Sequence, residues 1–155
     1  MPSHSKPEAV LFDLDGTLVD TASEFVTVVQ QMRRARNLEE LADQSIQSVV
    51  SDGAAGLIAL AFNCAPGMPG FDELRDEFLN AYEDQLGSSA QPYEGFRVLL
   101  QELSLQRIPW GVVTNKMRRF AEPLMTAMAF APPANALVTP CEVTQPKPHP
   151  EAILR

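Results

Sequence analysis

The 155-residue sequence has few cysteines, a deficit of basic residues and no long hydrophobic run. Its two cysteines, Cys64 and Cys141, show neither a disulfide framework nor a CxxC pair, so we expect free thiols in a reducing cytosol. Only 12 Lys and Arg stand against 20 Asp and Glu, and this balance argues against the positive face that nucleic-acid and membrane-surface binders need. No run approaches the ~18 apolar residues of a membrane span, and the polar N-terminus lacks the apolar core of a signal peptide. We expect a cytoplasmic protein, while the charge balance says nothing specific about a small-molecule substrate and the oligomeric state is undetermined.

Short apolar runs alternate with amphipathic segments at both ends of the sequence. Residues 9–14 (AVLFDL), 108–115 (IPWGVVTN) and 135–140 (NALVTP) have the composition of buried strands. Residues 96–103 (FRVLLQEL) and 120–130 (FAEPLMTAMAF) have helical spacing and lie before and after the second of these runs. Strands that alternate with helices in this way are typical of a parallel α/β sheet.

The region between these ends, residues 21–92, is helical in pattern throughout, with breaks at SDG, APGMPG and GSS. We interpret it as a helical insertion. The stretch TASE predicts a capping box, with Thr21 as N-cap and Glu24 reaching back to it. The helix that follows is expected to run to about Asn37 and to bury Phe25, Val28, Val29 and Met32.

Polar side chains follow the three expected strands at the points where they end. Asp13 and Asp15 come after the first, Thr114 and Asn115 after the second, and Lys147 in the loop after the third. Parallel strands end on one edge of a sheet, where ligands bind, so these groups are expected to converge. Two carboxylates ~4 Å apart repel by roughly 4 kcal/mol at an effective dielectric near 20, which favours a divalent cation between them. With a hydroxyl and an ammonium added, the set suits a phosphoryl group.

Three motifs together, FDLDGTLVDT, GVVTNK and PKPHPE, resemble the haloacid dehalogenase-like superfamily in its phosphoglycolate-phosphatase-like branch. The resemblance implies a Rossmann-like parallel core formed by residues 1–20 and 93–155, with an inserted α-helical cap formed by residues 21–92. It also implies Mg²⁺-dependent hydrolysis of a small phosphate ester through an aspartyl-phosphate intermediate.

Residue by residue, the resemblance implies that Asp13 is the nucleophile and Asp15 the general acid/base. Both would hold Mg²⁺, Asp13 through its side chain and Asp15 through its backbone carbonyl. The expected phosphate- or substrate-binding residues are Gly16, Thr17, Gly53, Thr114, Asn115 and Lys147, of which Gly53 belongs to the cap. We interpret the cations Lys116, Arg118 and Arg119 as surface charges, one of which could contact an anionic substrate.

The resemblance includes a fourth, acidic motif on a later strand, and no Gly-Asp-x-x-x-Asp follows Lys147 in this sequence. We therefore expect a fragment of low or no activity by itself, with a core incomplete at the C-terminus and the strand at residues 9–14 left as an open edge. Phosphoglycolate is the first expected substrate and N-acetylmuramic acid 6-phosphate the second. A sugar-phosphate mutase and a non-catalytic phosphate-binding or regulatory protein stay open as alternatives.

Overall fold

The computed structural model describes residues 6–155, and the chain divides into two compact units. A helical unit comprises Asp20–Gln91, and a sheet unit comprises the chain up to Val19 and from Pro92 onward. The chain passes between them at β2 (Val19–Asp20) and β3 (Gln91–Pro92), which form a two-stranded sheet. The sequence places its boundaries at 20/21 and 92/93, and a role of the helical unit as a cap stays a prediction.

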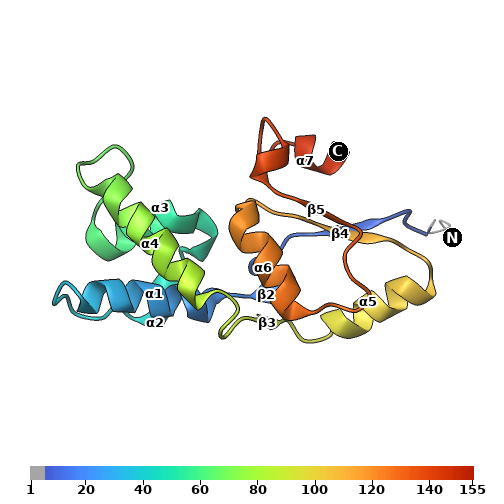
Figure 1. Ribbon diagram of the computed structural model, residues 1–155, viewed down its shortest axis with the longest axis horizontal. Coiled ribbons are helices and arrows are strands. Elements are labelled where there is room, and N and C mark those ends of the chain that lie inside the picture. Colours follow the sequence, from blue (N-terminus) through green and yellow to red (C-terminus); the bar gives the residue numbers. More distant parts are fainter. Residues whose placement is uncertain (1–5) are drawn as a thin grey trace, which may run out of the picture. The chain divides into compact units, whose positions relative to one another are not determined.

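The sheet unit contains a three-stranded sheet in the order β1 (Val10–Phe12), β4 (Trp110–Val113), β5 (Ala136–Val138), with both pairings parallel (Figure 1). Helix α5 (Phe96–Leu105) precedes β4, and α6 (Arg118–Met128) joins β4 to β5. The predicted α/β class with a parallel sheet is thus confirmed. The short helices η2 (Pro140–Glu142) and α7 (Glu151–Leu154) follow the last strand.

The core of the sheet unit forms around the central strand β4, in which all four residues are buried. Its Trp110 ring lies edge-on to Phe130, with centroids 5.8 Å apart. Phe12 of β1 makes a similar contact with Phe96 of α5 at 5.3 Å, which packs this helix against the sheet. Strand β1 lies at an edge of the sheet, and its Leu11 side chain is exposed.

The helical unit consists of α1 (Ala22–Arg34), α2 (Asp43–Gln47), η1 (Val50–Asp52), α3 (Gly53–Phe62) and α4 (Phe71–Gln85). Stacked rings of Phe25, Phe78 and Tyr82 join α1 to α4. The predicted buried face of the first helix is confirmed at all four positions. Within residues 6–155, no helix combines the length and apolarity needed to cross a bilayer.

The predicted capping box at the start of α1 is wrong. Thr21 is the N-cap residue, but it makes no side-chain capping hydrogen bond. The Glu24 carboxylate is fully buried, and its Oε1 accepts hydrogen bonds from the backbone N–H groups of Ser89 (3.3 Å) and Ala90 (3.1 Å). A tertiary contact 65 residues away along the chain therefore replaces the local one. The helix also ends at Arg34, before the expected Asn37.

Candidate active site

The loop that follows β1 carries the two predicted carboxylates on a tight turn. Leu14 O accepts hydrogen bonds from the N–H groups of Leu18 and Val19, both at 3.0 Å, while Gly16 N–H donates to Val19 O. Gly16 has φ 72°, a left-handed conformation that a residue with Cβ adopts at a cost. This turn lets Asp13 and Asp15 lie at the carboxyl end of β1 without extending the strand.

Asp13 forms an ion pair with Lys147, with Oδ1 and Nζ 2.7 Å apart. The same ammonium donates to Val113 O at 2.8 Å, at the end of β4. Asn115 Nδ2 donates to Lys147 O at 3.0 Å and so holds the backbone of the lysine loop. The Asp13 side chain is 45% exposed, so this ion pair is open to a ligand. Three predicted site residues from three different loops are thus joined by direct contacts.

Thr114 continues β4 beyond its last strand residue and is buried. Its N–H donates to Val138 O at 3.0 Å, which extends the pairing with β5. Its hydroxyl oxygen accepts a hydrogen bond from Lys116 N–H at 3.0 Å. Thr114 directly follows Val113, whose carbonyl accepts the hydrogen bond from Lys147. The Thr114 hydroxyl holds the start of the loop on which Asn115 and Lys116 lie.

Lys116 is the charged residue that sequence reasoning misjudged. Its ammonium lies 2.9 Å from Asp15 Oδ1, and its side chain is only 5% exposed. The interpretation of Lys116 as a surface charge is therefore wrong. The available signal was its position directly after Thr114 and Asn115, but its acidic partner lies 101 residues away, so no local spacing pointed to it.

Two of the predicted site residues, Thr17 and Gly53, take no part in the hydrogen bonds and ion pairs that join Asp13, Asn115 and Lys147. Thr17 is exposed in the turn after Asp15, with its N–H 3.4 Å from Leu14 O. Gly53 begins α3 in the helical unit, with φ 66°. A contact of either residue with substrate stays a prediction.

The oxygen atoms of this cluster match Mg²⁺ in kind, because Mg²⁺ is bound in proteins through one or two carboxylates and completes its shell with water and phosphate oxygens. Asp13 is the accessible carboxylate, and the Asp15 backbone carbonyl lies in the same turn. No group of three or more His, Cys, Asp or Glu residues that could hold a metal occurs among the described residues. A magnesium ion here would therefore depend on water and ligand oxygens.

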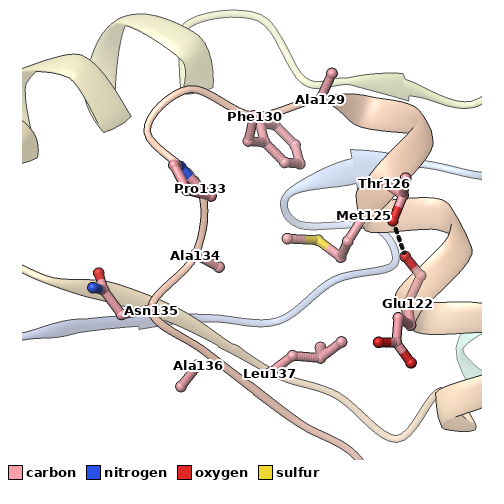
Figure 2. Close-up of a pocket in the computed structure, with 10 residues that line it drawn as sticks. All are labelled: Glu122, Met125, Thr126, Ala129, Phe130, Pro133, Ala134, Asn135, Ala136 and Leu137. Atoms are coloured by element: carbon pink, nitrogen blue, oxygen red, sulfur yellow. Dashed lines mark hydrogen bonds between the residues drawn. The ribbon is translucent and has the colours of Figure 1, made fainter.

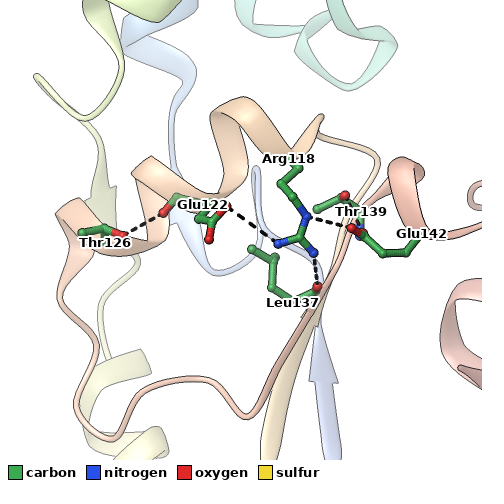
Figure 3. A network of polar contacts seen from close by, with 6 residues as sticks. All are labelled: Arg118, Glu122, Thr126, Leu137, Thr139 and Glu142. Atoms are coloured by element: carbon green, nitrogen blue, oxygen red, sulfur yellow. Dashed lines mark hydrogen bonds and ion pairs between the residues drawn. The ribbon is translucent and has the colours of Figure 1, made fainter.

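A second polar network joins the start of α6 to the segment after β5 (Figure 3). Arg118 Nε donates to Glu142 Oε1 at 2.7 Å, and its Nη2 donates to Leu137 O at 3.2 Å. Glu142 Oε2 accepts from both the N–H and the hydroxyl of Thr139, a capping box for η2. The Arg118 guanidinium, followed by the Thr139 hydroxyl, lowers the pKa of Glu142 to about 2.

This network predicts a pH-dependent stability. In the unfolded chain Glu142 titrates near 4.5, so its contribution is fully present above that pH and is lost as pH falls towards 2. Glu142→Gln is therefore expected to lower the melting temperature at pH 7, and the deficit should shrink below pH 4.5 and approach zero only near pH 2, as measured by circular dichroism. Glu102→Gln, on the exposed face of α5, is the matched control. A deficit in Glu142→Gln that stays constant between pH 7 and pH 2 would contradict the network.

A cavity of about 390 Å³ lies between the C-terminal half of α6 and the segment that leads into β5 (Figure 2). Met125 and Leu137 are among its apolar lining residues, and Glu122 is the charged one. The cavity is beside the beginning of β5, whereas ligands of parallel sheets bind beyond the carboxyl ends of the strands. The Asp13–Lys147 cluster, not this cavity, is therefore the candidate active site.

Comparisons with known proteins bear on the family and the fold of this chain. The family model described as haloacid dehalogenase-like hydrolase matches residues 10–155. The chain is 43% identical over 147 residues to an N-acetylmuramic acid 6-phosphate phosphatase of Pseudomonas aeruginosa, covering 95% of this chain and 65% of that protein. It is 35% identical to a phosphoglycolate phosphatase of Xanthomonas campestris pv. campestris, with 96% and 66% covered. A crystal structure titled as a predicted phosphoglycolate phosphatase from Haemophilus somnus 129PT superposes with TM-score 0.82 at 22% identity, over 97% of this chain and 70% of that one, and shows the same fold. The chain thus spans about two thirds of the length of the curated relatives it matches.

Proposed function

Because this chain belongs to the haloacid dehalogenase-like hydrolase family, we propose that the protein hydrolyses a small phosphate monoester, with Asp13 as the nucleophile. The observation that carries this proposal is the Asp13–Lys147 ion pair at the carboxyl end of β1. A carboxylate can attack a phosphorus atom only if the repulsion between two anions is offset. Lys147 supplies a positive charge 2.7 Å from the attacking group, held by the Val113 carbonyl.

The proposed reaction has two steps. Asp13 attacks phosphorus, the bond from phosphorus to the ester oxygen breaks, and Asp15 donates a proton to that oxygen so that it leaves as an alcohol. Asp15, now ionised, accepts a proton from a water molecule that attacks the aspartyl-phosphate, and this releases phosphate and restores Asp13. Lys147 and Thr114 bind phosphate oxygens, with Gly16, Thr17 and Asn115 lining the site. Mg²⁺ bound by the Asp13 carboxylate and the Asp15 carbonyl would neutralise phosphoryl charge.

Two substrates are proposed, and both carry a carboxylate besides the phosphate. Phosphoglycolate is the smaller, and four relatives that are 32–35% identical to this chain are named phosphoglycolate phosphatases. N-acetylmuramic acid 6-phosphate is supported by the 43% identity to a phosphatase named for that compound. A substrate contact by Gly53 and the helical unit belongs to the same proposal.

The test is release of inorganic phosphate from each ester, with and without Mg²⁺. Because the sequence predicts low activity for this chain, we expect at most slow hydrolysis of at least one ester with Mg²⁺. This hydrolysis should be lost on chelation and recovered when Mg²⁺ is added back, because the described residues bring few carboxylates to the metal. The relevant control is Ca²⁺, which is larger and tolerates irregular geometry, and is expected to restore little activity. Binding of orthophosphate without hydrolysis of either ester would favour the non-catalytic alternative, and transfer of phosphate to an acceptor sugar would favour the mutase.

A further inference from the structure

The lysine loop, residues 143–150, joins η2 to α7 and carries Lys147. It contains three prolines, Pro146, Pro148 and Pro150, and each of them lacks a backbone N–H. A loop of this composition has few donors with which to build a backbone hydrogen-bond network of its own. Its conformation therefore depends on side-chain acceptors, and this conformation sets where the Lys147 ammonium lies.

The Glu151 carboxylate is the acceptor that joins the two ends of the loop. Its Oε1 accepts a hydrogen bond from Thr144 N–H at 2.8 Å, and its Oε2 accepts one from Gln145 N–H at 2.9 Å. Glu151 is the first residue of α7, whereas both donors lie near the beginning of the loop. The N–H of Thr144, followed by that of Gln145, lowers the pKa of the Glu151 carboxyl, which favours the ionised form that accepts both bonds.

Lys147 lies within the segment that Glu151 closes. Its carbonyl accepts a hydrogen bond from Asn115 Nδ2 at 3.0 Å, which fixes one backbone atom of the lysine. Its ammonium reaches two oxygens, Asp13 Oδ1 at 2.7 Å and Val113 O at 2.8 Å. An ammonium that contacts two oxygens at such distances tolerates little displacement of the backbone that carries it.

We propose that Glu151 is a positioning residue, which holds the lysine loop closed and thereby keeps the Lys147 ammonium beside Asp13. Glu151 acts through Lys147 and takes no chemical step itself. The consequence for phosphate binding rests on the proposed function, whereas the placement of Lys147 can be tested without a substrate.

The first test measures how fast the lysine amines react with a limiting amount of acetic anhydride, located by mass spectrometry. The chain has three lysines, Lys6, Lys116 and Lys147. Lys6 is exposed and serves as the internal reference, while Lys116, whose side chain is 5% exposed, reports on the rest of the site. The Lys147 ammonium must leave its two oxygen partners before its amine can react, so we expect Lys147 to label slowly in the parent protein.

Glu151→Gln brings an NH₂ group against one of the two backbone N–H donors, so only one of the two hydrogen bonds can persist. We expect it to raise Lys147 labelling, relative to Lys6, by about tenfold, the fold-change that corresponds to one hydrogen bond with a charged group. Lys116 labelling should stay unchanged. Glu151→Asp, which retains both carboxylate oxygens on a shorter side chain, should retain part of the protection.

Glu102→Gln, on the exposed face of α5, is the matched control and should label as the parent protein does. Unchanged Lys147 labelling in Glu151→Gln would overturn the inference. Equal increases at Lys116 and Lys147 would overturn it too, because they would indicate a general loosening of the structure.

The second test measures the dissociation constant of orthophosphate by calorimetry with Mg²⁺. Glu151→Gln should weaken binding about tenfold. In a Lys147→Met background the same substitution should change binding less than about twofold, because the group through which Glu151 acts is gone. Equal weakening in both backgrounds would contradict a role through Lys147. Failure of the parent protein to bind orthophosphate would remove the proposed function, while the labelling result would still decide the role of Glu151.

Discussion

Asp13→Asn is expected to abolish phosphoryl transfer to the protein and to lower hydrolysis by at least roughly 10⁴-fold, as loss of a nucleophile does in other enzymes. The amide of asparagine carries no negative charge and does not form an acyl phosphate. The substitution keeps the shape of the side chain. The Leu14 N–H, which donates to Asp13 Oδ1 at 2.8 Å, therefore still has an oxygen acceptor. The effect is therefore chemical and not a loss of the loop structure.

The most direct test of this prediction detects a single phosphorylation of the protein instead of steady-state turnover. The protein is mixed with p-nitrophenyl phosphate and Mg²⁺ and quenched in acid, and the phosphorylated residue is located by mass spectrometry. Wild type should carry a hydroxylamine-sensitive phosphoryl group on Asp13, and Asp13→Asn should carry none. Asp72→Asn, on the exposed surface of α4, is the matched control and should behave as wild type. Label on another residue, or on Asp13→Asn, would contradict the assignment, and an unlabelled wild type would contradict the reaction.

The contacts of this site show which parts of it a sequence can predict. Asp13, Thr114 and Lys147 follow strands of one parallel sheet, and because parallel strands end on one edge, their convergence follows from topology alone. Topology alone does not show which charged side chain pairs with which. Asp15 and Lys116 are both conspicuous in the sequence, yet their ion pair joins two loops whose separation depends on the packing of β1 against β4.

In the helical unit, too, one local feature follows from the sequence and another does not. The apolar spacing of α1 predicts its buried face, because helical periodicity fixes which side chains share a side. The capping pattern at Thr21 and Glu24 fails because two backbone N–H groups near the end of the helical unit bond to the same carboxylate. A local motif thus competes with tertiary contacts that the sequence does not display.

Phe78→Ala is expected to destabilise the helical unit by about 3–5 kcal/mol. The Phe78 ring on α4 is almost fully buried and stacks on Phe25 at 6.2 Å and on Tyr82 at 6.4 Å. Removing it leaves a cavity where α1 meets α4, and the other two rings lose an aromatic neighbour. The free energy of unfolding of a domain is only about 5–15 kcal/mol, so this single substitution removes a large fraction of it.

Urea unfolding followed by two probes locates this effect. Trp110, the chain's only tryptophan, lies in β4 and reports on the sheet unit by fluorescence, whereas circular dichroism detects the helices of both units. Phe78→Ala should shift the dichroism transition to much lower urea, and Phe78→Leu, which retains more of the buried volume, should shift it less. Leu60→Ala, at a partly exposed position of α3, should cost below about 1 kcal/mol because little buried area is lost there. Equal costs for Phe78→Ala and Leu60→Ala would show that the stacked rings are not the centre of this core, and the helical unit would then need a different account of its stability.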